Sequence, residues 1–166
     1  MGWSFIENTT RRDVIEMLIK DESNQGYRWK TLKHCTRGNV LWTITERTHG
    51  NGDEVIRFIG CHLLQRSVET RHGRKVVSWG YKSMDESVHP YYYSCPLSYL
   101  NEVPTECEEW REKVRLYHHR YRIGDRLALV NCKVGHLVVT SLKPLVGKAH
   151  DGARYRVPRD RVVQVN

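Results

Sequence analysis

The segment HGNGD at residues 49–53 is the feature that most restricts the fold of this chain, because it places turn residues between two runs typical of β-strands. Its Asn-Gly dipeptide strongly favours the tight turn of an antiparallel hairpin. The runs on either side, residues 40–47 and 55–65, are rich in β-branched and aromatic side chains. The two runs are therefore predicted to pair as antiparallel strands.

Turn residues also separate this hairpin from one further strand on each side. The turn RGN (37–39) follows an alternating run over residues 29–35, and the turn RHGR (71–74) precedes a run over residues 75–82. Four consecutive strands joined by short turns predict an antiparallel meander. His62 stands in the most apolar run, where a histidine is more often a packed, hydrogen-bonded residue than a ligand.

Two helices are predicted, one on each side of the meander in the sequence. The first covers about residues 10–22, because Asn8, Thr9 and Thr10 are good N-cap residues and apolar side chains recur behind them on one stripe. We expect this helix to cover one face of the meander. The second begins near Thr105, with acidic residues near its start and basic residues toward its end, as a helix dipole favours.

Short β-like runs separated by Gly and Pro follow residue 124 and predict three or four small strands in a small curled sheet or half-barrel. The predicted fold class is α+β, and the 166 residues fit a single domain. Residues 1–104 would hold the first helix, the meander and an aromatic junction stretch that begins at Trp79. Residues 105–166 would hold the second helix and the small β portion.

The formal net charge of +8 favours an acidic partner, with nucleic acid first and an acidic protein surface second. Positive charge is denser in residues 101–166, which carry 13 Lys and Arg against 8 Asp and Glu. Many small soluble proteins are basic without binding nucleic acid, so the charge alone leaves this alternative open.

The cysteines and the N-terminal sequence indicate a reduced, cytoplasmic protein. The five cysteines are odd in number, widely spaced and without a C-x-x-C pair, so they suggest neither a zinc site nor a disulfide framework. No metal or other cofactor is expected. No run approaches the ~18 apolar residues of a membrane span, and the N-terminus has no basic start followed by an apolar run. The sequence does not indicate an oligomeric state.

Several sequence blocks resemble an uncharacterised family of small proteins encoded on bacterial phages, plasmids and other mobile elements. The blocks are RGNVLWTI, RFIGCHLLQR, WGYKSMDES, YYYSCPLSYL, EWREKVRLYH, and TSLKPLVG with DGARYRVPR. The resemblance covers nearly the whole chain, and WGYKSMDES followed by CPLSYL is its most specific part. It implies an accessory protein of a mobile element that handles nucleic acid or interferes with host defence, and it assigns no catalytic role to any residue.

The leading functional prediction is therefore binding to nucleic acid or to a host nucleoprotein. Aromatic rings would stack on bases and arginines would contact phosphates. A solvated helix face or strand face explains the same arginines without a ligand. The candidate residues are Trp79, Tyr81, Tyr92, Arg111, Arg115, Arg154, Arg156 and Arg159.

An enzyme acting on a nucleotide or a nucleic-acid base is the first alternative. Asp85 and Glu86 would be its acid and base, with Lys82 beside them, although adjacent carboxylates on a strand point to opposite faces and converge only in a turn. No recognised catalytic motif supports this alternative. The second alternative is an inhibitor that binds a host protein directly. If the protein has a pocket, residues 81–86 are predicted to form one wall.

Overall fold

The computed structural model describes residues 2–50, 52, 54–85, 92–103 and 107–166, and shows an α+β protein in which strands predominate. The chain forms two compact units. The N-terminal unit comprises Met1–Pro90 and Ser98–Cys107, and the C-terminal unit comprises Tyr91–Leu97 and Glu108–Asn166. The division predicted after residue 104 falls within the second segment of the N-terminal unit.

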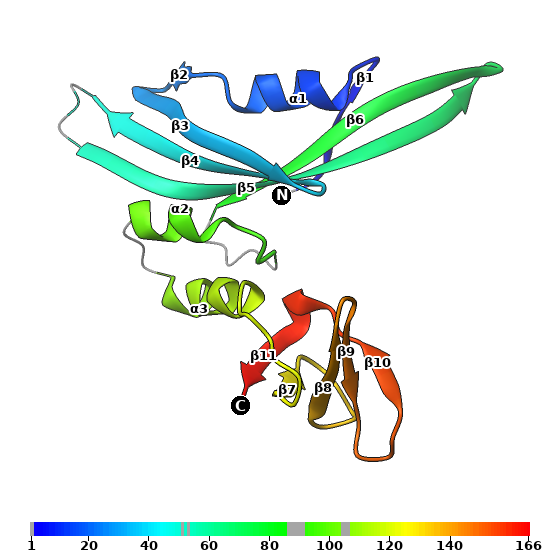
Figure 1. Cartoon of the computed structure of the whole chain (residues 1–166). Helices are drawn as coiled ribbons and strands as arrows, with labels where there is room; N and C mark the ends of the chain where they lie inside the picture. Colours follow the sequence, from blue (N-terminus) through cyan, green and yellow to red (C-terminus); the bar gives the residue numbers. More distant parts are fainter. Residues whose placement is uncertain (1, 51, 53, 86–91, 104–106) are drawn as a thin grey trace. The chain divides into compact units, whose positions relative to one another are not determined.

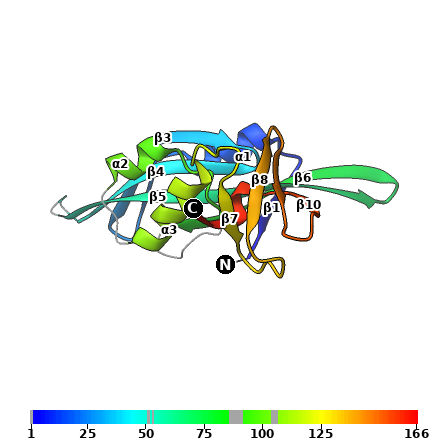
Figure 2. The ribbon, with the colours of Figure 1, turned by 60° about the horizontal axis from the view of Figure 1, so that its bottom comes forward.

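The N-terminal unit contains a curled six-stranded antiparallel sheet, sheet A, with the strand order β1-β6-β5-β4-β3-β2 (Figures 1 and 2). The predicted meander is confirmed as β3 to β6, and β5 lies between β4 and β6. The sequence predicted a curled sheet in the C-terminal part of the chain, whereas the curled sheet of the structure is sheet A. The strands are β1 (Ser4–Glu7), β2 (Glu22–Asn24), β3 (Tyr27–Arg37), β4 (Val40–His49), β5 (Glu54–Arg71) and β6 (Arg74–Asp85).

The outer strands β1 and β2 were not predicted, because runs of four and three residues show too little alternation. Strand β1 pairs with β6, and Phe5 lies opposite Gly80. A β-carbon at Gly80 would collide with the Phe5 ring, so the glycine lets the ring lie on the sheet. The β5–β6 turn was predicted correctly: His72 and Gly73 have φ of 50° and 75°, as a type I′ turn requires.

Helix α1 (Arg11–Leu18) covers one face of sheet A, here called the inner face (Figure 1). Its Val14 is fully buried and packs in one cluster with Leu41 of β4 and Leu64 of β5. The helix is shorter than predicted, since the chain already enters β2 at Glu22. Its start matches the prediction, because Thr10 and Asp13 form a reciprocal capping box.

We expect Thr10→Ala to lower the free energy of unfolding by about 1 kcal/mol, because the capping box loses its hydroxyl. The Thr10 hydroxyl accepts a hydrogen bond from the backbone N–H of Asp13, at 3.2 Å. Urea unfolding followed by circular dichroism measures the loss. Thr10→Ser keeps the hydroxyl and should stay close to the wild type, and equal losses in both variants would show that the cap is not the cause.

The opposite face of sheet A carries large buried side chains, among them Trp42 and Ile59. Helix α2 (Leu97–Glu102) lies on this side of the sheet (Figure 1) and buries Tyr99 and Leu100. An ion pair of 2.7 Å between Lys33 and Glu102 links β3 to this helix. The sequence did not predict α2, whose six residues are too few for a clear helical period.

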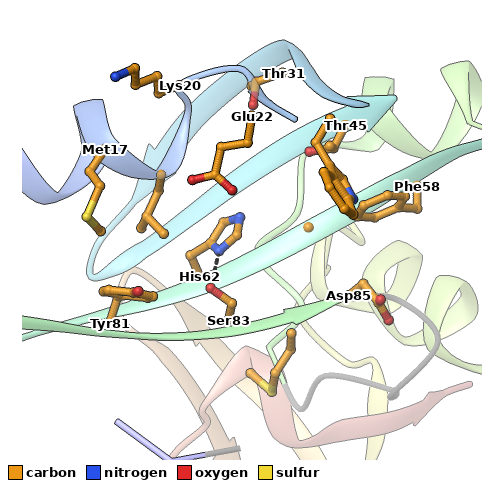
Figure 3. A pocket seen from close by; sticks show the side chains of 14 residues that line it. Met17, Lys20, Glu22, Thr31, Thr45, Phe58, His62, Tyr81, Ser83 and Asp85 are labelled. Atoms are coloured by element: carbon orange, nitrogen blue, oxygen red, sulfur yellow. Dashed lines mark hydrogen bonds between the residues drawn. The ribbon is translucent and has the colours of Figure 1, made fainter. Parts of the chain in front are cut away.

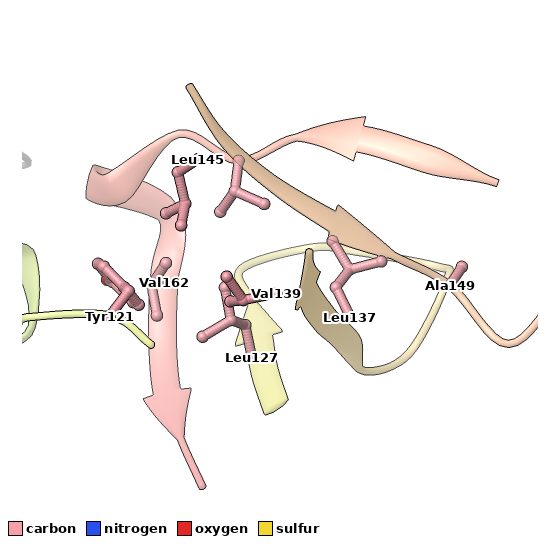
Figure 4. Close-up of a cluster of buried hydrophobic side chains, with 8 residues drawn as sticks. Tyr121, Leu127, Leu137, Val139, Leu145, Ala149 and Val162 are labelled. Carbon is pink, nitrogen blue, oxygen red and sulfur yellow. The ribbon is translucent and has the colours of Figure 1, made fainter. Parts of the chain in front are cut away.

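The C-terminal unit combines helix α3 (Glu108–Tyr117) with a five-stranded antiparallel sheet, sheet B, in the order β10-β9-β8-β7-β11. The predicted second helix corresponds to α3, and because α2 precedes it the predicted order of helices is matched only in part. Thr105, its predicted cap, lies outside the described residues. Leu127, Leu137 and Val139 lie in one buried cluster on the inner side of sheet B (Figure 4). The remaining elements are β7 (Arg126–Leu129), β8 (Leu137–Leu142), β9 (Leu145–Lys148), β10 (Arg154–Arg156), the 3-10 helix η2 (Arg159–Arg161) and β11 (Val162–Val165).

All five cysteines are free, as the sequence indicated. Cys95 is fully buried. Burial raises the pKa of Cys61 to about 12, so this cysteine stays a thiol at neutral pH.

Candidate functional site

A groove of about 380 Å³ lies on the inner face of sheet A, next to the last turn of α1 (Figure 3). We call it the inner groove. Strands β2 to β6 and the end of α1 contribute its walls. Its lining combines aromatic, hydroxyl and charged side chains, including Trp29, Phe58 and Tyr81, then Thr31, Thr45, His62 and Ser83, then Lys20, Glu22 and Asp85.

Strand register brings these side chains together. His62 of β5 lies opposite Ser83 of β6, and Gly60 lies opposite Asp85. Cross-strand partners share a face of an antiparallel sheet, and so do residues two apart on one strand, which adds Tyr81 to the same face. The groove is therefore built by one face of sheet A, on which strand pairing brings together residues between positions 22 and 85.

His62 is hydrogen-bonded in the floor of the groove. Its Nδ1 lies 2.7 Å from the Ser83 hydroxyl, and its Nε2 lies 3.4 Å from the Thr43 hydroxyl. Burial lowers the pKa of His62 from its ordinary 6.5 to about 4, so the ring is neutral at pH 7. The predicted hydrogen bonding is confirmed. A base of this low pKa holds a proton too weakly to activate Ser83 as a nucleophile.

Of the residues predicted for an acid–base site, Asp85 lines the groove and Lys82 does not. Tyr81, Ser83, Met84 and Asp85 line the groove, as the predicted wall requires. Lys82 lies opposite Leu63 in β5, and strand alternation directs the two side chains away from the face that carries Asp85. Lys82 and Asp85 therefore point to opposite faces of β6. Glu86 lies outside the described residues.

The groove residues that sequence reasoning missed come from other strands. Trp29, Phe58 and His62 line the groove from β3 and β5. Alternation along each strand places Trp29 and Thr31 on one face, but their distance to Tyr81 depends on strand register. Register over so many strands is not visible in a single sequence.

The three aromatic residues predicted to stack on bases lie in separate environments. Trp79 packs against the cluster formed by α1 and the inner face of sheet A. Tyr81 lines the inner groove. Tyr92 belongs to the C-terminal unit, where its side chain is 40% exposed and its backbone carbonyl accepts a 3.1 Å hydrogen bond from Trp110 Nε1. Of the three residues, Tyr92 is exposed, whereas Trp79 and Tyr81 are half-buried.

The predicted phosphate-contacting face of α3 is wrong for Arg111, which is only 6% exposed. Arg111 precedes Val114 by three residues, so it lies beside the buried stripe rather than opposite it. Arg115 is exposed, but it forms ion pairs with Glu108 at 2.5 Å and Glu112 at 3.0 Å. Its charge is balanced within its own helix.

A row of cations crosses the outer face of sheet B, the face opposite the buried cluster. Arg154 of β10 lies opposite Lys148 of β9, Lys148 lies opposite Val138 of β8, and Val138 lies opposite Arg126 of β7. The four side chains therefore share one face across four adjacent strands, and all four are exposed. Arg156 is also exposed, two residues along β10 on the same face.

A shallow groove of about 220 Å³ runs over this face. Its polar lining includes Arg126, Lys148, His136 and His150 and no carboxylate. None of the five strands of sheet B contains Asp or Glu. We call this surface the basic face, formed by Arg126, His136, Lys148, His150, Arg154 and Arg156.

Arg159, the remaining predicted phosphate contact, is exposed but anchored. Its guanidinium lies 4.8 Å from the centre of the Tyr121 ring and donates a 3.2 Å hydrogen bond to the carbonyl of His119. The cation–π contact fixes the side chain and leaves part of its charge accessible.

Comparisons with protein-family models, with curated proteins and with solved structures found no match for this chain. The resemblance to proteins of mobile elements stays a prediction. Within the described ranges, no group of three or more His, Cys, Asp or Glu side chains could hold a metal ion. Nor is any helix of that part of the chain long and apolar enough to cross a membrane.

Proposed function

We propose that the C-terminal unit binds nucleic acid through the basic face of sheet B and contacts phosphates rather than bases. The observation that carries this proposal is the row of Arg126, Lys148 and Arg154 across four strands that contain no carboxylate. Three strand spacings of about 4.8 Å make the row about 14 Å long. A nucleic-acid strand presents roughly four phosphates over that length.

The distribution of charge between the units supports this assignment. The C-terminal unit carries 13 Lys and Arg against 6 Asp and Glu, a net charge of +7. The N-terminal unit carries 14 against 13, a net charge of +1. The excess charge that favours a polyanion is therefore almost entirely in the unit that holds the basic face.

The arrangement of the cations costs stability, which a purely structural role does not explain. Arg154 and Lys148 are directly opposite on adjacent strands, and like charges in this position are destabilising. Neither side chain forms an ion pair with a described residue that would relieve the repulsion. A phosphate between them would turn this repulsion into attraction.

Contacts to phosphates imply binding with little sequence preference. No Phe, Tyr or Trp lines the groove of the basic face, so the stacking that holds single-stranded bases has no ring to use there. An accessory protein of a mobile element that handles nucleic acid or a nucleoprotein needs such a surface. The resemblance and the basic face thus support the same function, whereas catalysis at Asp85 and direct inhibition of a host protein stay predictions.

Salt dependence tests the proposal. Fluorescence anisotropy of labelled DNA and RNA oligonucleotides, single-stranded and double-stranded, would give the affinity between ~50 and ~200 mM salt. About four phosphate contacts predict that the affinity for single strands falls roughly 50-fold over this range. No binding at ~50 mM salt, or binding independent of salt, would contradict the proposal.

A further inference from the structure

We propose that the inner groove of sheet A binds an uncharged planar heterocycle that carries amino groups, as a nucleobase or a nucleoside does. The site lies within the N-terminal unit and does not depend on the basic face. Its volume of about 380 Å³ falls in the range of roughly 300 to 1,000 Å³ that small-molecule pockets occupy. A base with its sugar is of a size that such a groove accommodates.

The apolar part of the lining suits a flat ring. Phe58 lies at one end of the groove in Figure 3, and Tyr81 lies toward the other end. Trp29 of β3 also lines the groove. Each of the three rings is half-buried, so each still presents surface to the groove. Stacking on such rings stabilises a heterocycle by about 1 to 3 kcal/mol per base.

The polar part of the lining offers more acceptors than donors. The hydroxyls of Thr45 and Ser83 can both donate and accept, whereas the carboxylate of Glu22 only accepts. Both nitrogens of the His62 ring are already hydrogen-bonded within the protein. Figure 3 shows the Glu22 carboxylate directed into the groove above the His62 ring. A ligand with N–H donors on its edge, such as an amino-substituted base, matches this pattern.

The charge of the lining argues against a phosphorylated ligand. Figure 3 shows the Glu22 carboxylate directed into the groove, whereas the ammonium group of Lys20 points away from it. A phosphate in the groove would meet the Glu22 carboxylate, and repulsion between like charges would weaken its binding. The groove therefore prefers a nucleoside to the matching nucleotide, which is the opposite of what the basic face prefers.

Isothermal titration calorimetry on the full chain tests this inference. The probes are adenosine, guanosine, cytidine and uridine, each with its 5′-monophosphate. The background is the triple variant Arg126→Glu/Lys148→Glu/Arg154→Glu, so that the basic face cannot hold the phosphate. At least one nucleoside should bind with a Kd of ~1 mM or below. Its monophosphate should bind at least about fivefold more weakly.

Two variants locate the site. Glu22→Gln keeps the shape of the groove and removes one charge, so it should reduce the preference for the nucleoside over its monophosphate at least about twofold. Phe58→Ala should weaken nucleoside binding about tenfold. Glu54→Gln, an exposed change at the start of β5 away from the groove, is the matched control and should change neither value.

The outcomes that overturn the inference are equally specific. The inference is wrong if none of the four nucleosides binds at ~5 mM. It is also wrong if a monophosphate binds as tightly as its nucleoside, or if a folded Phe58→Ala protein binds nucleosides as the wild type does. Thermal unfolding shows whether Phe58→Ala is folded, and Glu22→Gln tests the site if it is not. Because the nucleosides carry no phosphate, their binding succeeds or fails independently of the basic face.

Discussion

Reversing three charges of the basic face, in the variant Arg126→Glu/Lys148→Glu/Arg154→Glu, is expected to weaken nucleic-acid binding more than about 100-fold at ~50 mM salt. Each reversal removes a cation from the row and places a carboxylate against a phosphate. The three side chains are exposed and form no ion pair or side-chain hydrogen bond with a described residue, so each change should alter stability by only ~0.5 kcal/mol or less.

Fluorescence anisotropy at constant salt measures this loss, and a matched triple reversal separates local contacts from net charge. Arg37→Glu/Arg66→Glu/Lys75→Glu makes the same change in net charge at exposed positions of the N-terminal unit. This control should weaken binding only a few fold, because none of its three residues belongs to the basic face and only the net charge of the protein changes. Equal losses in the two triple variants would show that the basic face is not the binding surface.

The main part of sheet A was predictable because local signals agree along its four long strands. The turns at residues 37–39 and 71–74 stand where the hairpins close, and the runs between them have strand composition. The short elements were not predictable, because they lack such local signals. Strands β1 and β2 and helix α2 form through contacts with the rest of the unit, such as Phe5 on Gly80, rather than through a pattern of their own.

The two candidate surfaces were predictable only in part, because strand register decides which side chains meet. Alternation along residues 154–156 places Arg154 and Arg156 on one strand face. The sequence does not show that Arg126 and Lys148 lie on the same face, because this depends on the pairing of β10 with β9, β9 with β8 and β8 with β7. The burial of Arg111 could have been predicted from helical spacing, because a residue three positions before a buried valine is its neighbour on the helix.

The two surfaces differ in chemistry as well as in place. The inner groove is lined by rings, hydroxyls and two carboxylates, and the basic face by cations around Val138 and Thr140. One surface suits uncharged ligands with N–H groups, and the other suits extended polyanions. A substitution in the inner groove that keeps the net charge, such as Phe58→Ala, should therefore leave oligonucleotide binding unchanged, which the nucleoside and oligonucleotide titrations can measure on the same variant.

Lowering the pH from ~7 to ~4.5 is expected to destabilise the N-terminal unit by about 2 to 3 kcal/mol through His62 alone. The folded state keeps the pKa of His62 at about 4, whereas the ordinary value is 6.5. Between these two values the unfolded state binds a proton that the folded state does not. The free energy of unfolding therefore rises with pH across this window and levels off above it, where His62 is neutral in both states.

Urea unfolding at several pH values, compared with His62→Gln, isolates this contribution from those of the carboxylates. The variant keeps a polar side chain at this position and removes the titrating group, so its stability should depend much less on pH between ~5 and ~6.5. Ser83→Ala is the informative second variant, because it removes the hydrogen bond to Nδ1 and leaves the ring in place. Since burial is what lowers the pKa, Ser83→Ala should keep most of the pH dependence. A His62→Gln protein with the pH dependence of the wild type would show that the proton is taken up elsewhere.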